Sequence, residues 1–215
     1  MAQAFLLVYA GLFPIVNPVG NAPIFLALTA NHNEAVRRML AGRVAVNGFL
    51  LLLGSLFVGS HVLVFFGITV PVLRIAGGLV VAAFGWSMLR DGAGAAHDAG
   101  PGDTEGPVDA FYPLTLPLTV GPGSIAVAVA LGSQRPTALD NLDSFWQAGA
   151  GAIIGLAAIA LTIFLCYRFA GRMVAMMGAS VINVLTRMSS FILLCIGVQI
   201  IWGGISALFG LPSHQ

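Results

Sequence analysis

The sequence predicts an all-α membrane protein whose six transmembrane helices form an inverted 3+3 repeat. The first observation is composition: 58% of the 215 residues are hydrophobic and 8% are charged, whereas a soluble domain carries about 25% charged residues. The second is that six apolar segments approach the roughly 20 residues that a membrane-spanning helix needs. The third is a pattern of prolines and glycines that occurs twice, about a hundred residues apart.

The six predicted spans are long, apolar and nearly free of charged side chains. They are residues 5–29, 44–66, 71–89, 111–131, 146–167 and 185–208. The second and the fifth are the clearest, and neither contains Arg, Lys, Asp or Glu. The first span lacks a basic N-terminal region and is too long for the apolar part of a signal peptide. We therefore expect the first span to be retained in the protein.

A polar segment at residues 90–110 divides the chain into two halves, residues 1–89 and 111–215. Five of the eight acidic residues lie in this segment among glycines and prolines. Such a composition is typical of a flexible, solvated linker. A metal site is the alternative, but the glycine-rich spacing would not hold the carboxylates in a fixed geometry.

The repeated pattern lies inside the first and fourth spans, at residues 13–24 and 112–125. Proline removes a backbone donor and clashes with the preceding helical turn, so each copy should interrupt its helix. We expect the interruptions at residues 17–22 and 117–124. Interrupted helices at membrane depth are tolerated where they are buried in protein or line a cavity. Paired interruptions in two halves of a chain indicate the binding site of a transporter.

The similarity between the two halves continues into their last spans. Gly67 and Arg74, near the start of the third span, match Gly178 and Arg187 near the start of the sixth. Each half then contains an interrupted helix, a plain helix and a helix headed by Gly and Arg. An odd number of spans per half turns the second copy upside down, which predicts an inverted repeat.

The arginines outside the spans predict the orientation of the chain. One side holds six of them: Arg37, Arg38, Arg43, Arg90, Arg168 and Arg172. The other side holds only Arg135. Cytoplasmic loops carry an excess of positive charge, so the arginine-rich side should face the cytoplasm. Both termini then lie on the opposite side of the membrane.

The two interruptions supply groups that suit a small zwitterion. Free N–H groups at a helix N-terminus attract a carboxylate, and we expect them at Gly20–Asn21 or at Gly123–Ser124. Unwound carbonyl groups could take an ammonium group or a cation. A coupling cation, either a proton or sodium, is a further expected partner. Simple proline kinks stabilised by polar side chains are the alternative. The candidate substrate-binding residues are Asn17, Gly20, Asn21, Thr115, Thr119, Gly121, Gly123 and Ser124.

Three further polar residues inside the spans are candidates for the same site. Arg74 and Arg187 are the only full charges within the predicted spans. Each could extend to the interface or bond to carbonyl groups of a neighbouring helix, or it could contact a substrate carboxylate. Gln199 lies deep in the sixth span, where it could bond across helices or face the cavity.

Other classes of function are less consistent with the residues present. The net charge of +1 gives no reason to expect nucleic-acid binding. No predicted span contains Asp or Glu, which disfavours an ion or metal exporter. An enzyme with Ser124 as nucleophile would need a base within hydrogen-bond reach, and His61 lies at the far end of a span. We therefore expect neither enzymatic activity nor a cofactor.

These motifs resemble those of the MarC family of bacterial membrane proteins. The resemblance rests on residues 13–24 and 112–125, together with residues 74–78 and 197–199, and it covers essentially the whole chain. It implies a six-span protein of the bacterial inner membrane, in which the arginine distribution would place both termini in the periplasm. It also implies a relation to the LysE-type transporter superfamily and to a protein described as a transporter of small neutral amino acids.

The function that this resemblance implies is secondary transport of glycine, alanine or serine by alternating access around the two interrupted helices. The partners would then be a small zwitterionic amino acid, the lipid bilayer and a coupling cation. An ion or metal exporter of the LysE-type superfamily is the alternative.

Overall fold

The computed structural model describes residues 1–91, 109–132 and 142–210, and every regular element in those ranges is a helix. The predicted all-α class is therefore confirmed for this part of the chain. The elements are α1 (Ala2–Val16), α2 (Pro18–Leu28), α3 (Glu34–Phe65), α4 (Val70–Asp91), the π-helix η2 (Leu114–Thr119), α6 (Pro122–Gly132), α7 (Leu142–Arg168) and α8 (Ala170–Phe209). Most of the predicted linker, and Arg135, lie outside the described residues.

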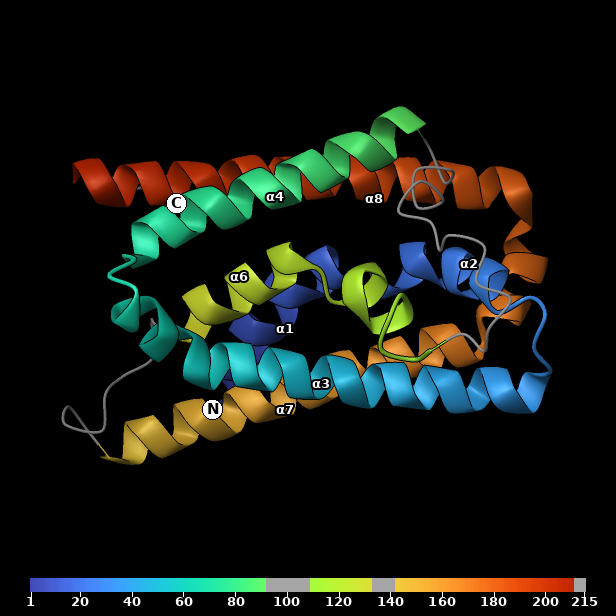
Figure 1. The fold of residues 1–215 in the computed structure, drawn as a ribbon, viewed down its shortest axis with the longest axis horizontal. Coiled ribbons are helices and arrows are strands. Elements are labelled where there is room, and N and C mark those ends of the chain that lie inside the picture. The colour runs from blue at the N-terminus through green and yellow to red at the C-terminus, as the bar shows by residue number, and fades with distance from the viewer. Residues whose placement is uncertain (92–108, 133–141, 211–215) are drawn as a thin grey trace.

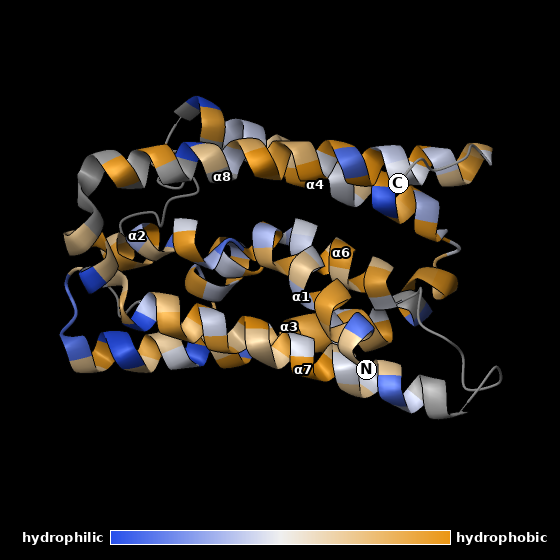
Figure 2. Ribbon diagram, turned by 180° about the vertical axis from the view of Figure 1, so that it is seen from behind, coloured by the Kyte–Doolittle hydropathy of each residue, from blue (hydrophilic) through white to orange (hydrophobic). Residues whose placement is uncertain are grey.

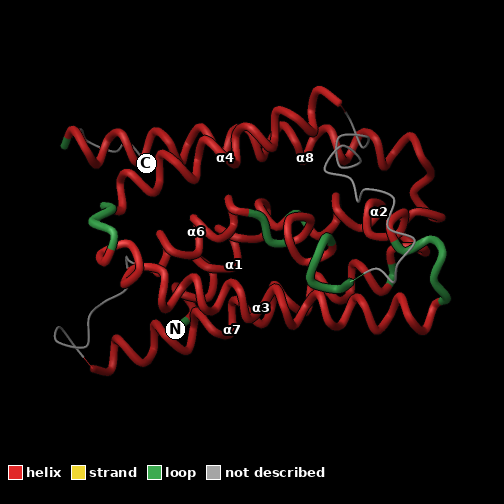
Figure 3. Tube along the Cα trace, in the orientation of Figure 1, coloured by secondary structure: helices red, strands yellow, loops and turns green. Residues whose placement is uncertain are grey.

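The helices run along one common long axis (Figure 1), and short loops join most of them (Figure 3). Helices α4 and α8 form one layer, and α1, α2, α3, η2, α6 and α7 lie together beside it. Buried aliphatic side chains of α1, α3 and α7 form the centre of the second group. Among them are Leu12, Leu52, Leu56, Leu156 and Ile163.

Four helices contain apolar segments long enough to cross a membrane. These segments are Glu34–Gly59, Val70–Ser87, Trp146–Arg168 and Ser190–Phe209. Helices α1 and α2 form a fifth candidate span, bent by 42°. Helix α6 is too short to count as a span by itself, because it has 11 residues. The chain is thus a multi-pass α-helical membrane protein, while the sixth span and the inverted repeat stay predictions.

Two segments that we expected as loops are largely helical. Helix α3 already begins at Glu34, because the side-chain oxygen of Asn33 accepts a 2.9 Å hydrogen bond from the N–H of Val36 and caps the helix. The expected loop at residues 168–184 is wrong, since only Phe169 separates α7 from α8. The arginines there mark the edge of the apolar region. A helix can continue past that edge into water.

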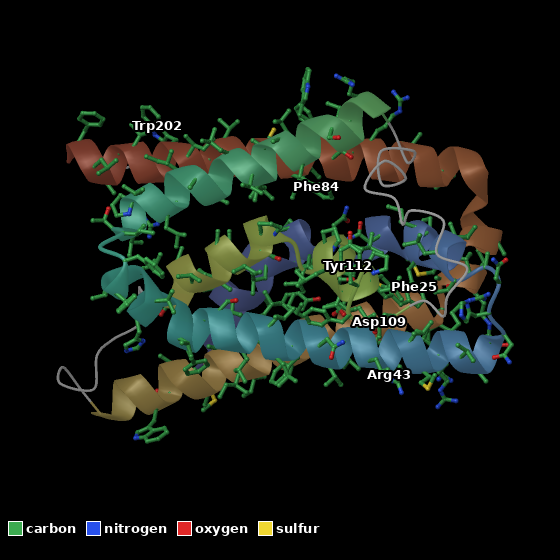
Figure 4. The ribbon with its side chains drawn as sticks, viewed as in Figure 1. Phe25, Arg43, Phe84, Asp109, Tyr112 and Trp202 are labelled. Atoms are coloured by element: carbon green, nitrogen blue, oxygen red, sulfur yellow. The ribbon has the colours of Figure 1, made fainter. Side chains whose placement is uncertain are left out.

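Hydrophobic residues occur along all of the long helices (Figure 2), and many large apolar side chains are exposed on the outside of the bundle. Leu161, Phe191 and Trp202 are between 52% and 57% exposed, and Trp202 projects outward from α8 (Figure 4). Monomeric soluble proteins rarely expose contiguous apolar surface of this extent. This surface therefore fits contact with lipid tails.

Helices α4 and α8 approach each other closely through glycines. A Cβ atom at Gly85 would lie 2.9 Å from the carbonyl oxygen of Ser190, and one at Gly78 would lie 2.8 Å from that of Gly197. From the other side, a Cβ at Gly197 would lie 2.8 Å from the Cα of Ala82. Small residues let membrane helices pack backbone against backbone, and that packing drives their association in lipid.

We predict that Gly197→Ala destabilises the protein while Gly203→Ala on the same helix does not. Both changes replace glycine by a better helix former, but only the first places a methyl group against the α4 backbone. Overpacking of this kind costs about 1–3 kcal/mol. Thermal unfolding of the purified variants in detergent would measure the difference, and equal melting temperatures would refute the interpretation of the glycine interface.

Candidate functional site

The first interruption is a single residue, Asn17, which is left-handed with φ of 44° and ψ of 56°. Its N–H donates to the carbonyl of Phe13 and so closes α1. Its side-chain oxygen accepts a 3.2 Å hydrogen bond from the N–H of Gly20 and so caps α2. Pro18 occupies the first helical position, where no N–H is required. The break is therefore narrower than the predicted residues 17–22.

The second interruption is longer and begins inside η2. Leu116 has an extended backbone there, with φ of −110° and ψ of 129°. The surrounding backbone bonds span five residues, as in the 2.8 Å bond from the N–H of Val120 to the carbonyl of Thr115. Regular helix resumes at Pro122. The prediction placed this break at residues 117–124, so it began one residue too late and ended inside α6.

Two threonines hold this irregular segment by bonding back to its own backbone. The hydroxyl of Thr115 donates to the carbonyl of Ala110, and that of Thr119 donates to the carbonyl of Leu114, each at 2.7 Å. Both threonines are buried. The carbonyl of Ala110 also accepts from the N–H of Thr115 at 3.1 Å, so the hydroxyl adds a second bond to it.

The side chain of Asn21 joins the two interruptions. Its amide nitrogen donates to the carbonyl of Val16 at 3.0 Å and to that of Leu118 at 2.8 Å. These two acceptors fix the orientation of the amide, because carbonyl groups cannot donate. Asn21 is 2% exposed, and its side-chain oxygen has no hydrogen-bond partner among the residues that the structure describes. The two breaks are thus in contact, and one buried acceptor beside them is unpaired.

Tyr167, near the end of α7, supports the same junction. Its hydroxyl lies 2.8 Å from the hydroxyl of Thr119, and because that hydroxyl donates to Leu114, Tyr167 donates to Thr119. Its ring stacks on Phe25 of α2 with the centroids 4.4 Å apart. Sequence reasoning missed Tyr167, because a tyrosine at a span end is typical of the membrane interface. Here it is fully buried.

A cavity of about 80 Å³ lies where η2 and α6 face the α4–α8 layer. Four of the predicted residues line it: Thr119, Gly121, Gly123 and Ser124. The opposite wall is apolar. It includes Val81 and Phe84 of α4 and Leu193 of α8, none of which the sequence distinguished from lipid-facing residues. Figure 4 shows Phe84 on α4 beside this region.

The N-terminus of α6 presents N–H groups to this cavity. In the described residues, no acceptor bonds the N–H of Gly123 or Ser124. The side chain of Ser124 turns back and donates to the carbonyl of Gly121 at 2.8 Å. At the first break, by contrast, Asn17 already accepts from the N–H groups of Gly20 and Asn21. Of the two predicted carboxylate sites, only the one at Gly123–Ser124 has free donors.

The remaining predicted site residues do not line the cavity. Asn17, Gly20, Asn21 and Thr115 shape the two breaks without contributing to its wall.

The polar residues outside the breaks are also separate from the cavity. Arg187 and Gln199 are exposed on the outside of α8, and Arg74 is half-buried on α4. The exposure of Arg187 favours the interfacial interpretation, and that of Gln199 disfavours a cavity-facing position. Arg74 lies two turns before Val81 on α4 and is not part of the cavity lining.

Comparison with known proteins identifies the family of this chain. The model of the MarC family integral membrane proteins matches residues 2–209. The UPF0056 membrane protein YvbG of Bacillus subtilis is 29% identical over 206 residues, which cover 94% of each chain. The UPF0056 inner membrane protein MarC of Salmonella typhimurium is 33% identical over 202 residues, 90% of each chain. No solved structure matches the chain. The chain therefore belongs to the MarC family of integral membrane proteins.

Proposed function

We propose that this protein is a secondary transporter of small neutral amino acids that works by alternating access around the two interrupted helices. The observation that supports this best is the cavity at the meeting point of the breaks, with unbonded N–H groups of α6 at its edge. A helix N-terminus carries a partial positive charge and free donors, so it suits the carboxylate that all amino acids share.

The ammonium group of the substrate would find oxygen acceptors on η2. The hydroxyl of Thr119 donates to Leu114 and accepts from Tyr167, and its second lone pair could accept from the substrate. Leu118 and Pro117 line the same wall, in the part of η2 where the helix is irregular. Donors on α6 and acceptors on η2 would then hold the two ends of a zwitterion.

The size of the cavity favours the smallest side chains. Its volume of about 80 Å³ is well below the roughly 300–1,000 Å³ of ordinary ligand pockets. Glycine, alanine and serine are the amino acids that need least room. Val81, Phe84 and Leu193 would limit the length of the side chain.

The helix contacts are compatible with two related halves. In such a repeat, α1, α2, α3 and α4 correspond to η2, α6, α7 and α8. The contact between α4 and α6 then corresponds to that between α8 and α2, and the contact between η2 and α3 to that between α1 and α7. The contacts α3–α7 and α4–α8 each join an element of the first half to its counterpart in the second half. Exchanging the two halves maps these contacts onto one another, which is compatible with an inverted 3+3 repeat that has η2 and α6 as its sixth span. Rocking of the α4–α8 layer would expose the site to each side in turn, driven by a proton or sodium gradient.

Transport can be tested with the purified protein in proteoliposomes that carry an imposed proton or sodium gradient. We predict gradient-dependent uptake of labelled glycine, with alanine and serine competing and leucine and phenylalanine failing to compete.

Replacing Phe84 or Val81 by alanine should let leucine compete, because either change removes part of the wall that limits the side chain. Val72→Ala, on an exposed part of the same helix, is the matched control.

Two results would count against this function. If no gradient drives glycine uptake in vesicles that contain correctly inserted protein, the transport proposal fails. If Phe84→Ala and Val81→Ala transport glycine with unchanged selectivity, the cavity is not the substrate site.

We also predict that both termini are periplasmic. Arg43 lies toward the end of the bundle where α2 meets α3 (Figure 4), while the N-terminus and the end of α8 lie toward the other end (Figure 1). The arginine-rich end should face the cytoplasm. A phosphatase fused after Gln215 should therefore be active and a fluorescent protein fused there should be dark. Bright fluorescence with an inactive phosphatase would reverse the orientation.

A further inference from the structure

A groove of about 510 Å³ lies on the outside of the bundle between α3 and α7, away from the interrupted helices. Its lining includes Arg38, Gly42, Arg43 and Asn47 of α3, and Phe164 of α7. We propose that this groove binds the headgroup of an anionic phospholipid. The proposal does not depend on the transport function.

The charge of the groove matches a phosphate. Arg38 and Arg43 are both exposed at its edge and form no ion pair in the described residues. The guanidinium of Arg168 lies 6.0 Å from the ring centre of Phe164 and adds a third positive charge beside the groove. Glu34, the one acid of α3, lies a turn before Arg38 without pairing to it. Guanidinium groups bind phosphate oxygens through two parallel N–H donors.

Arg37 lies next to Arg38 but serves a different purpose. Its guanidinium donates to the carbonyl of His32 at 3.1 Å and to that of Thr29 at 3.4 Å. It thereby fixes the connection between α2 and α3. Among the three arginines of α3, Arg38 and Arg43 at the groove therefore remain for a ligand.

The position along α3 places the groove at headgroup depth. The uncharged part of α3 runs from Val44 to Phe65, which at 1.5 Å per residue is about 33 Å long, close to the hydrocarbon thickness of a bilayer. Arg38 and Arg43 come just before this part and so fall in the polar layer. Basic pockets between transmembrane helices at this depth are known to bind anionic headgroups.

The surface next to the groove suits acyl chains. Met39, Val46 and Leu50 are 47%, 58% and 57% exposed. Their spacing of seven and four residues puts them on one face of α3. Leu161 and Leu165 are also exposed, on α7. A lipid with its phosphate on the arginines would thus find an apolar path leading toward the middle of the bilayer.

Native mass spectrometry of the full-length protein can test this site, with phosphatidylglycerol and phosphatidylcholine added in equal amounts. We expect wild type to retain phosphatidylglycerol preferentially. Each of Arg38→Gln and Arg43→Gln should lower that preference about fivefold, since a basic residue near the surface contributes about that factor. Gly42→Leu should fill the groove without changing its charge. The larger side chain fits there, because the nearest atom to a Cβ at this position is 3.9 Å away.

Arg90→Gln is the matched control, since it removes one charge at the end of a different helix, α4. The proposal is overturned if the Arg38→Gln/Arg43→Gln double variant keeps the wild-type preference, or if Arg90→Gln lowers it equally. It is also overturned if inorganic phosphate displaces the lipid at equal concentration, because the groove would then bind free anions. Circular dichroism of each variant confirms that the helices are intact before the comparison.

Discussion

The side chain of Asn21 is the contact on which the candidate site depends. An interrupted helix leaves carbonyl groups without their usual N–H partners, and the bilayer interior offers no water to replace them. Asn21 supplies one donor to Val16 at the end of α1 and another to Leu118 in η2. An unsatisfied buried acceptor costs about 1–3 kcal/mol. One amide therefore stabilises both breaks and also holds them against each other.

The geometry of the cavity follows from this junction. With η2 fixed against the first break, the extended residues after Thr119 turn the chain so that α6 begins at the cavity wall. Helix α4 then closes the space from the other side. A Cβ at Gly123 would collide with the side chain of Val81, so the close approach of α4 to the start of α6 requires glycine. The same layer packs internally, backbone against backbone, through Gly85 and Gly197.

The sequence predicted the two breaks because proline and glycine act locally. Proline prevents regular helix wherever it occurs inside a span, so residues such as Pro117 and Pro122 reveal an interruption without any knowledge of neighbours. The family resemblance also followed from these local motifs. The start of α8 was missed because charged residues do not determine the local backbone conformation. Arg168 and Arg172 indicate where the membrane ends, but a helix can continue through them.

The details of the site depend on contacts between distant residues, which one sequence does not reveal. Gly20 and Gly123 lie in similar motifs, yet Asn17 caps the N–H of Gly20 while that of Gly123 is free. Val81 and Phe84 are apolar residues of an apolar helix, so their inward position was not predictable. Gln199 suggested an inward role through its polarity, but the rotation of α8 places it outside.

The central claim is that the N-terminus of α6 binds the carboxylate of a small amino acid. Solid-state NMR on protein labelled with ¹⁵N-serine, in lipid with ¹³C-carboxyl glycine, measures this contact directly. We predict a dipolar coupling that corresponds to about 3–4 Å between the glycine carboxyl carbon and the Ser124 amide nitrogen, as an N–H···O bond of normal length requires. The coupling should disappear in Ser124→Ala, which lacks the label at that position. Bound glycine without such a coupling, or a coupling that persists in Ser124→Ala, would contradict the account.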